Sequence, residues 1–195
     1  MKIEESFYQR RDVVGIAKEL FGKVLFTKIK GIVTGGMIVE TEAYSNLERG
    51  CHAYQNRMTP RNEVMFKAGG HAYVYLCYGI HHLFNVVTNQ DGQAEAVLVR
   101  ALEPIKGIDL MIRRMGAKNE KRITSGPGKL TKAMGIDRSL NGENLWSRHL
   151  WLEDVGFTIK KSEIVSSPRI GIDYAGQDAL LRWRFTVKNN SWVSK

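Results

Sequence analysis

Two strand-like runs separated by a two-residue turn set the strongest limit on the fold of this chain. Residues 24–29 and 32–44 are rich in apolar and β-branched side chains, and only Lys30 and Gly31 lie between them. This spacing is typical of a β-hairpin. Gly35 and Gly36 interrupt the second run, which indicates a bulge or the close approach of another backbone.

The rest of the chain predicts further strands with a few helices among them. Asp12 suits an N-cap and Gly22 a C-terminal stop, so we expect a helix between them. Residues 71–89 predict two strands around a turn at Gly79. The other expected elements are helices at 108–115 and within 125–135, and strands at 96–102, 150–155, 164–172 and 181–187. No repeat or linker interrupts them, so we expect one mixed domain over residues 1–195 with many antiparallel connections.

The charge of the chain favours a polyanionic partner. There are 29 Lys and Arg residues against 20 Asp and Glu, a formal charge of +9, and hydrophobic residues make up 43%, enough for a core. Residues 106–138 hold nine basic and three acidic side chains, a local surplus that indicates a patch. Nucleic acid is favoured over membrane. Many proteins are basic without binding a polyanion, so charge alone does not decide.

Cysteine usage and hydropathy exclude several classes. Cys51 and Cys77 are the only cysteines, and no CxxC pair exists, so the chain is neither a disulfide framework nor a zinc ribbon. The N-terminal residues include no apolar signal region, and no segment reaches 18 apolar residues. We therefore expect a cytoplasmic protein without a membrane span.

The stretch VETEAY, residues 39–44, places Glu40, Glu42 and Tyr44 at alternate positions of an expected strand. Such positions share one face. Two carboxylates at this spacing repel, so the pKa of one should rise if they are partly buried. A carboxylate of that kind can act as a general base on water. The alternative is that one or both form an ion pair with an arginine on a neighbouring strand.

Tyrosines alternate in YVYLCYG, residues 73–79. Tyr73 and Tyr75 share a face, and Tyr75 could stack on a base. Tyr78 has the other parity and precedes Gly79, so it could stand at the tip of a turn and wedge between base pairs. An ordinary aromatic core is the alternative for all three.

Two glycine- or arginine-containing loops could contact phosphate. SGPGK, residues 125–129, lacks the spacing of a P-loop, but its free backbone N–H groups and Lys129 could bind a phosphate of DNA or RNA. RMTPRN, residues 57–62, carries Arg57 and Arg61 in a polar segment, and phosphate contact and a solvated loop are equally compatible with it. The five histidines lack the spacing of metal ligands, so we expect no metal site.

Together these stretches closely resemble the alkyladenine (3-methyladenine) DNA glycosylase family of the methylpurine type. Many motifs in family order are far more specific than one. They are VETEAY (39–44), TPRN with MF (59–66), YVYLCYGIHHLFN (73–85), VLVRALEP (97–104), SGPGKL (125–130), PRIGI (168–172) and SWVS (191–194). The resemblance implies an α+β fold, a single mixed domain whose curved, largely antiparallel sheet carries flanking helices and a protruding DNA-intercalating β-hairpin.

The resemblance also implies catalytic and base-binding roles. Glu42 matches the general base that activates the attacking water, and Arg100 an arginine near that water and the DNA backbone. Tyr44 and Tyr75 match the aromatics that stack on the flipped base. Tyr78 matches the intercalating tyrosine that replaces the extruded nucleotide.

Further matches concern the pocket wall and the DNA backbone. His52 matches a histidine at the pocket edge, and Leu98 lines the wall. Asn85 matches an asparagine that screens out purines with a 2-amino group. Arg61 and Lys129 fall in motifs that contact DNA phosphates.

Two features depart from the family pattern at the pocket rim. Cys51 stands where a smaller residue is expected, and the segment from Tyr44 to His52 is about one residue short. They bear on substrate range more than on reaction type. No family role carries over to Glu40, which could raise the pKa of Glu42 or only form ion pairs.

The resemblance implies a monofunctional DNA repair glycosylase without metal or cofactor. It would excise alkylated or deaminated purines such as 3-methyladenine, 7-methylguanine, hypoxanthine and ethenoadenine from double-stranded DNA and leave an abasic site. We expect a monomer, with the nucleoid as its place in a bacterium and the nucleus in a eukaryote. Two other classes remain open, a non-catalytic nucleic-acid-binding module and a metal-dependent nuclease using Glu40, Glu42 and the histidines.

Overall fold

The expected hairpin forms and provides the central strand of the sheet. The computed structural model describes all 195 residues. Strand β1 (Lys23–Ile29) pairs antiparallel with β2 (Ile32–Ser45), and Lys30 and Gly31 turn with positive φ angles of 51° and 80°. The register of β2 shifts between Gly35 and Gly36, and a Cβ on Gly35 would lie 2.4 Å from the Phe26 ring. The expected bulge and close approach are both confirmed.

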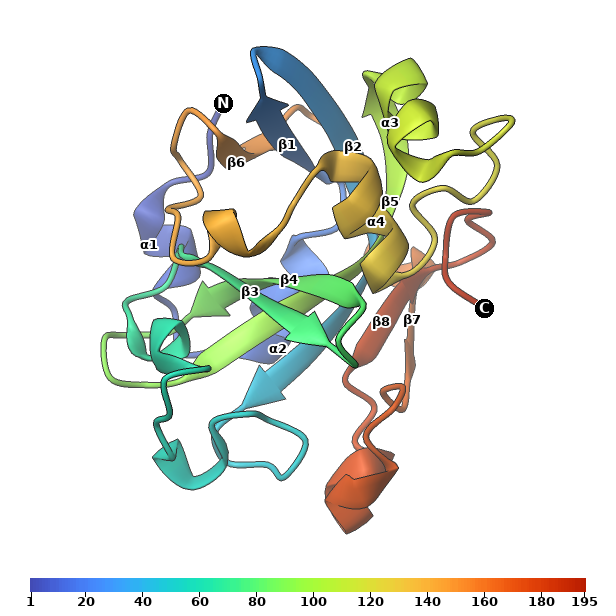
Figure 1. Ribbon diagram of the computed structural model, residues 1–195. Coiled ribbons are helices and arrows are strands. Elements are labelled where there is room, and N and C mark those ends of the chain that lie inside the picture. The colour runs from blue at the N-terminus through green and yellow to red at the C-terminus, as the bar shows by residue number, and fades with distance from the viewer.

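All strand pairs of the sheet are antiparallel (Figure 1). The main path runs β3 (Ala72–Cys77), β4 (His81–Thr88), β5 (Glu95–Lys106), β2, β1 and β6 (Leu150–Asp154). The end of β2 that carries Glu40 and Glu42 pairs with β8 (Arg184–Val187), which pairs in turn with β7 (Ile164–Ser167). The expected α+β class with a largely antiparallel sheet is confirmed.

The strands expected at 164–172 and 181–187 are shorter in the structure than predicted. Strand β7 ends at Ser167, directly before Pro168, and β8 begins only at Arg184. Proline has no N–H for a ladder bond, so pairing stops there. The chain between the two strands instead forms a loop with a distorted 3₁₀ segment, η5 (Asp173–Leu180).

Four α-helices flank the sheet: α1 (Glu5–Tyr8), α2 (Val13–Glu19), α3 (Ile108–Met115) and α4 (Pro127–Met134). The Asp12 carboxylate accepts the Gly15 N–H at 2.8 Å, which confirms the expected N-cap of α2. Figure 1 shows α2 behind the sheet and α4 in front of it. Helix α1 and the short 3₁₀ segments η1 (Tyr54–Asn56), η2 (Glu63–Phe66), η3 (Arg138–Leu140) and η4 (Lys161–Glu163) were not expected. None of the helices has the length and apolar character needed to cross a membrane.

Buried apolar side chains form two clusters. The larger joins the sheet to α2, α3 and α4 and contains 31 residues. The smaller contains nine, and it lies beneath the irregular segment between β2 and β3. Tyr44 and Tyr75 pack against the smaller cluster from outside. These two aromatic rings are therefore held by a separate core rather than by the loops alone.

Candidate active site

A cavity of about 740 Å³ opens between the β3–β4 hairpin, the start of α4 and the loop after β7. This size suits a small-molecule or nucleobase ligand. Nine of the ten expected site residues line it: Tyr44, His52, Arg61, Tyr75, Tyr78, Asn85, Leu98, Arg100 and Lys129. The tenth, Glu42, is fully buried directly behind this lining.

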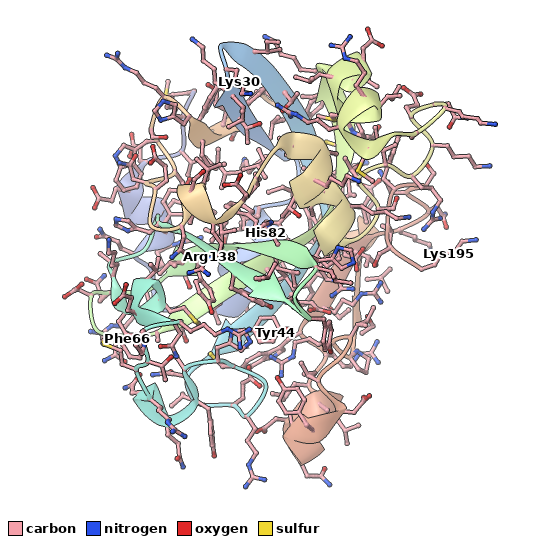
Figure 2. All side chains as sticks on the ribbon, in the orientation of Figure 1. Lys30, Tyr44, Phe66, His82, Arg138 and Lys195 are labelled. Atoms are coloured by element: carbon pink, nitrogen blue, oxygen red, sulfur yellow. The ribbon has the colours of Figure 1, made fainter.

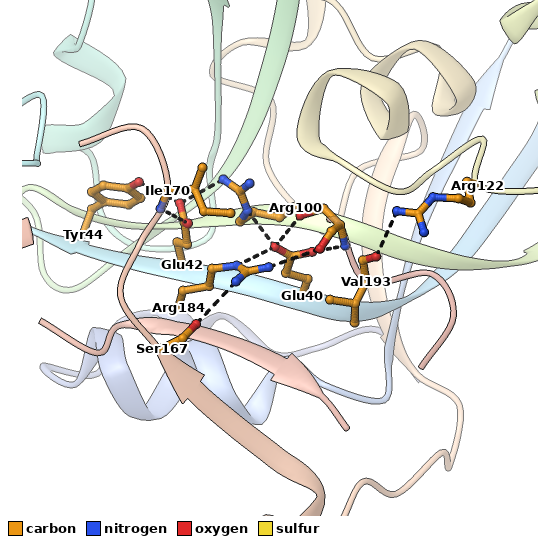
Figure 3. A network of polar contacts seen from close by, with 10 residues as sticks. Glu40, Glu42, Tyr44, Arg100, Arg122, Ser167, Ile170, Arg184 and Val193 are labelled. Carbon is orange, nitrogen blue, oxygen red and sulfur yellow. Dashed lines mark hydrogen bonds and ion pairs between the residues drawn. The ribbon is translucent and has the colours of Figure 1, made fainter. Parts of the chain in front are cut away.

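Arg100 on β5 joins the two carboxylates of β2 (Figure 3). Its Nε donates to Glu40 Oε1 at 2.8 Å, and its Nη1 donates to Glu42 Oε2 at 3.2 Å. Glu40 and Glu42 are both inaccessible to solvent. The expected ion pairs with an arginine of a neighbouring strand are therefore present for both carboxylates.

Glu40 is held on all sides. Besides Arg100, it accepts from Arg184 Nε at 2.9 Å and from the backbone N–H and hydroxyl of Ser194 at 2.6 and 2.8 Å. A carboxylate has roughly four acceptor positions, and Glu40 has four donors, three at Oε1 and one at Oε2. Burial alone would raise the pKa of Glu40, but Arg100, Ser194 and Arg184 outweigh it and lower the pKa. Glu40 is therefore not a carboxylate whose pKa is raised.

Glu42 has one donor fewer. It accepts the Ile170 N–H at Oε1 (2.9 Å) and the Tyr44 hydroxyl at Oε2 (2.8 Å), in addition to Arg100. One of its roughly four acceptor positions is left for a further donor. Burial, and then the charge of Glu42, raise the pKa of Tyr44 well above its ordinary value, so the hydroxyl keeps its proton and donates it. Tyr44, Arg100 and Ile170 all line the cavity, so the Glu42 carboxylate lies directly behind this part of the cavity wall.

Aromatic rings form the wall around Tyr75. The ring centroids of Tyr75 and Tyr73 lie 5.2 Å apart, and His52 meets Tyr75 edge-on at 4.7 Å. The guanidinium of Arg61 lies 5.1 Å above the Tyr75 ring. A base stacked on that face would have to displace Arg61. Figure 2 shows Tyr44 inside the molecule, below the β3–β4 hairpin that carries His82.

His52 lies at the cavity mouth, where part of the residue is open to solvent and part is covered, and it hydrogen-bonds through Nδ1 to the Tyr73 hydroxyl at 3.0 Å. Partial burial and the nearby charge of Arg61 lower the pKa of His52 to about 4. The imidazole is therefore neutral at neutral pH. A neutral ring can hydrogen-bond a ligand but adds no repulsion toward a cationic one.

Tyr78 stands at the tip of the β3–β4 hairpin, as expected. Its side chain is 88% exposed, the highest value among the aromatic residues, and its φ of 49° beside Gly79 at 72° makes a tight turn. A bulky residue in the left-handed region costs conformational energy. Packing within the chain therefore does not explain why a tyrosine stands at this strained and exposed position.

The remaining expected residues lie on the wall and rim. Asn85 of β4 and Leu98 of β5 are paired in register and buried, and Asn85 donates to the Tyr73 carbonyl at 3.1 Å. Lys129 is exposed in the first turn of α4, after the N-cap Gly126. The expected glycine loop entering a helix is thus confirmed.

Some residues of the site were not singled out from the sequence. Arg169 packs behind Tyr44, and the Ile170 backbone holds Glu42, although the segment was noted only as the motif PRIGI. Tyr174 of η5 also lines the cavity, and its hydroxyl donates to the Gly50 carbonyl at 3.3 Å. Gly171, with φ of 77°, was the available signal that this segment turns rather than extends. The histidines do not gather, and no group of three or more His, Cys, Asp or Glu side chains could hold a metal ion.

Comparisons with known proteins agree with this geometry. The family model described as Methylpurine-DNA glycosylase (MPG) matches residues 6–191. A protein of Carboxydothermus hydrogenoformans is 48% identical over 195 residues, covering all of both chains. One of Methanocella arvoryzae is 47% identical, covering 99% of this chain and 96% of its own. One of Natranaerobius thermophilus is 44% identical, covering 100% and 99%.

These three relatives share the name "Putative 3-methyladenine DNA glycosylase". The family model spans nearly the whole chain, and each relative is matched over nearly its full length. The chain belongs to the methylpurine-DNA glycosylase family, and it is a DNA glycosylase of base-excision repair.

Proposed function

We propose that this enzyme flips alkylated or deaminated purines out of duplex DNA and hydrolyses their N-glycosidic bond with a water activated by Glu42. The observation that carries the proposal is the Glu42 carboxylate, which keeps one acceptor position free and is hydrogen-bonded to three residues that line the aromatic cavity. The substrates are those expected from the sequence: 3-methyladenine, 7-methylguanine, hypoxanthine and ethenoadenine.

Base flipping explains the exposed tip of the hairpin. A base within a duplex is out of reach of an enzyme until its nucleotide is rotated out of the stack. Tyr78, exposed next to the cavity, would fill the gap left behind. Arg61 and Lys129 at the rim would then contact the flanking phosphates. This requires Arg61 to leave the face of Tyr75 as the base enters.

The cavity suits a cationic purine. N-alkylated purines carry a positive charge, and Tyr44 and Tyr75 would offer aromatic faces worth roughly 0.5–2 kcal/mol per contact. His52 adds no opposing charge, because its lowered pKa keeps it neutral. Asn85 and Leu98 would limit the shape of the bound base, and Asn85 would oppose a 2-amino group.

One carboxylate suffices for the chemistry of a cationic substrate. The water oxygen bonds to C1′ and passes a proton to Glu42, while the purine leaves with the electron pair of the broken bond. Glycosidases of the common type need a second carboxyl group to protonate the leaving group. A cationic purine is already a good leaving group, so Glu40 is free to hold Arg100 and Arg184 instead. Neutral purines would need protonation by another route.

We also propose that the enzyme is monofunctional and acts as a monomer. Cleavage of the DNA strand by a glycosylase needs an amine nucleophile that forms an imine at C1′. Lys129 is the one lysine that lines the cavity, and it lies exposed on α4 among the glycines of the phosphate-binding loop. This position suits a phosphate contact rather than attack on the sugar.

A duplex with a single hypoxanthine or ethenoadenine tests the proposal. Incubation with the enzyme should produce strand breaks only after hot alkali, because abasic sites are alkali-labile. Prior dialysis against a chelator should leave this result unchanged. Direct breaks would indicate a nuclease. Tight binding of the hypoxanthine duplex and of the ethenoadenine duplex without any breaks would indicate a binding module.

A further inference from the structure

Arg169 occupies an unusual position behind the base-binding wall. Its guanidinium lies 4.7 Å above the Tyr44 ring and 5.4 Å above the Trp183 ring, so it contacts both aromatic faces. The side chain has no solvent exposure and does not line the cavity, whereas Tyr44 does. The Tyr44 ring therefore separates a permanently charged guanidinium from the space in which a base would stack.

Glu48 neutralises this guanidinium from the segment after β2. Its two carboxylate oxygens accept from the two terminal nitrogens of Arg169 at 2.6 and 2.7 Å, a bidentate pair. Glu48 also accepts the Gly50 N–H at 2.7 Å and is 3% exposed. A guanidinium does not lose its proton in a protein, so Glu48, its ion-pair partner, is the main group that balances the charge behind Tyr44.

The buried charges of the site as a whole are balanced. Three carboxylates, Glu40, Glu42 and Glu48, face three guanidiniums, Arg100, Arg169 and Arg184. The net charge of these six groups is zero, so a cationic base meets no surplus of positive charge inside the protein. Arg61, at the opposite wall, is exposed, and solvent screens it.

We propose that the Glu48–Arg169 pair determines how strongly the pocket prefers cationic over neutral purines. Arg169 fixes the Tyr44 ring from behind by stacking on it, and Glu48 cancels the charge that would otherwise repel a cation on the other face. This inference rests on the proposed function, because it assumes that damaged purines stack on Tyr44. Arg169 and Glu48 are positioning and specificity residues, since neither touches the base.

The size of the effect follows from the distances. The guanidinium lies 4.7 Å from the ring, and a stacked base would lie about 3.5 Å beyond it. An unpaired charge roughly 8 Å from a cationic base, in surroundings of intermediate polarity, should weaken its binding on the order of tenfold. A neutral base at the same place should feel almost none of this repulsion.

Binding to uncleavable DNA measures the preference directly. Duplexes would carry a 2′-fluoro nucleotide with 7-methylguanine, which is cationic, or with ethenoadenine, which is neutral. The readout is the ratio of the two affinities, each taken relative to an undamaged duplex. Glu48→Gln should lower this ratio on the order of tenfold. The double variant Glu48→Gln with Arg169→Gln removes both charges and should bring the ratio back to the wild-type value.

A purely structural role of the pair predicts a different outcome. Misplacing Tyr44 would weaken both affinities together, so a ratio unchanged in Glu48→Gln would overturn the inference. If that variant does not fold, Arg169→Gln leaves the Glu48 carboxylate without its partner and should raise the ratio; an unchanged ratio there has the same consequence. A wild-type enzyme that binds neither lesion better than undamaged DNA would instead overturn the proposed function itself.

Discussion

Glu40→Gln should destabilise the protein strongly although Glu40 is given no part in the chemistry. The carboxylate is fully buried and holds Arg100 and Arg184, whose side chains are 9% and 16% exposed. Removing the charge leaves two poorly solvated guanidiniums and turns an amide N–H₂ group toward other donors. Breaking a buried ion pair in this way costs about 3–5 kcal/mol. Arg184 can regain some water, so we expect the lower end, about 3 kcal/mol.

Urea unfolding, followed by the fluorescence of the four tryptophans, measures this loss. A loss of about 3 kcal/mol should also lower the melting temperature by about 6–12 °C in a chain of this size. Glu19→Gln is the matched control, because Glu19 pairs with Arg10 in an ion pair that is 41–51% exposed. Its free energy of unfolding should change by less than about 1 kcal/mol.

The difference in stability between wild type and Glu40→Gln should also depend on pH. The pKa of Glu40 is lowered in the folded protein, so its charge contributes stability above the unfolded-state value of 4.5, and this contribution disappears as the pH falls through the folded-state pKa. The stability gap between wild type and Glu40→Gln should therefore be constant near neutral pH and narrow well below pH 4.5. A gap below about 1 kcal/mol at neutral pH, or one that widens in acid, would refute the reasoning.

Three further substitutions test other contacts. Tyr78→Ala should weaken binding to a lesion duplex without changing stability, because the ring is 88% exposed; unchanged lesion binding in a band-shift assay would remove the wedge role. Tyr44→Phe deletes the 2.8 Å hydrogen bond to Glu42 and should slow excision roughly tenfold, as judged by single-turnover rates, whereas an unaffected rate would separate this hydroxyl from the chemistry. Tyr8→Phe removes a buried hydroxyl without a partner and should raise the free energy of unfolding by about 1 kcal/mol in a urea titration; a loss of stability would reveal a missed partner.

Local patterns predicted the parts of the fold that neighbouring residues determine. The Lys30–Gly31 and Tyr78–Gly79 turns need backbone conformations that glycine tolerates, and helix α3 formed over the residues expected. The strand expected at 164–172 is too long, because apolar residues continue past Ser167 although Pro168 ends the pairing and Gly171 turns the chain. The 3₁₀ segments between β2 and β3 have no apolar period that a sequence can reveal.

The candidate site depends on contacts that no local pattern encodes. Alternation placed Glu40 and Glu42 on one face of a strand, and the family resemblance selected Glu42 as the base. Spacing could not show that Ser194, 154 residues away, would fill the acceptor positions of Glu40. It also could not show that Arg169, 121 residues from Glu48, would pack behind Tyr44. The sequence indicated ten candidate residues, whereas the pairing of their charges with Glu48, Arg169 and Arg184 is visible only in the structure.

The rate of base excision by Glu42→Gln tests the central claim most directly. The measurement is a single-turnover assay on a duplex with one hypoxanthine, developed with hot alkali, for wild type, Glu42→Gln and Glu40→Gln at a temperature where all three are folded. Loss of a general base should slow Glu42→Gln by about a hundredfold or more while lesion binding persists, with a much smaller loss in Glu40→Gln. Near wild-type excision by Glu42→Gln, together with an inactive but folded Glu40→Gln, would show that the wrong carboxylate has been assigned.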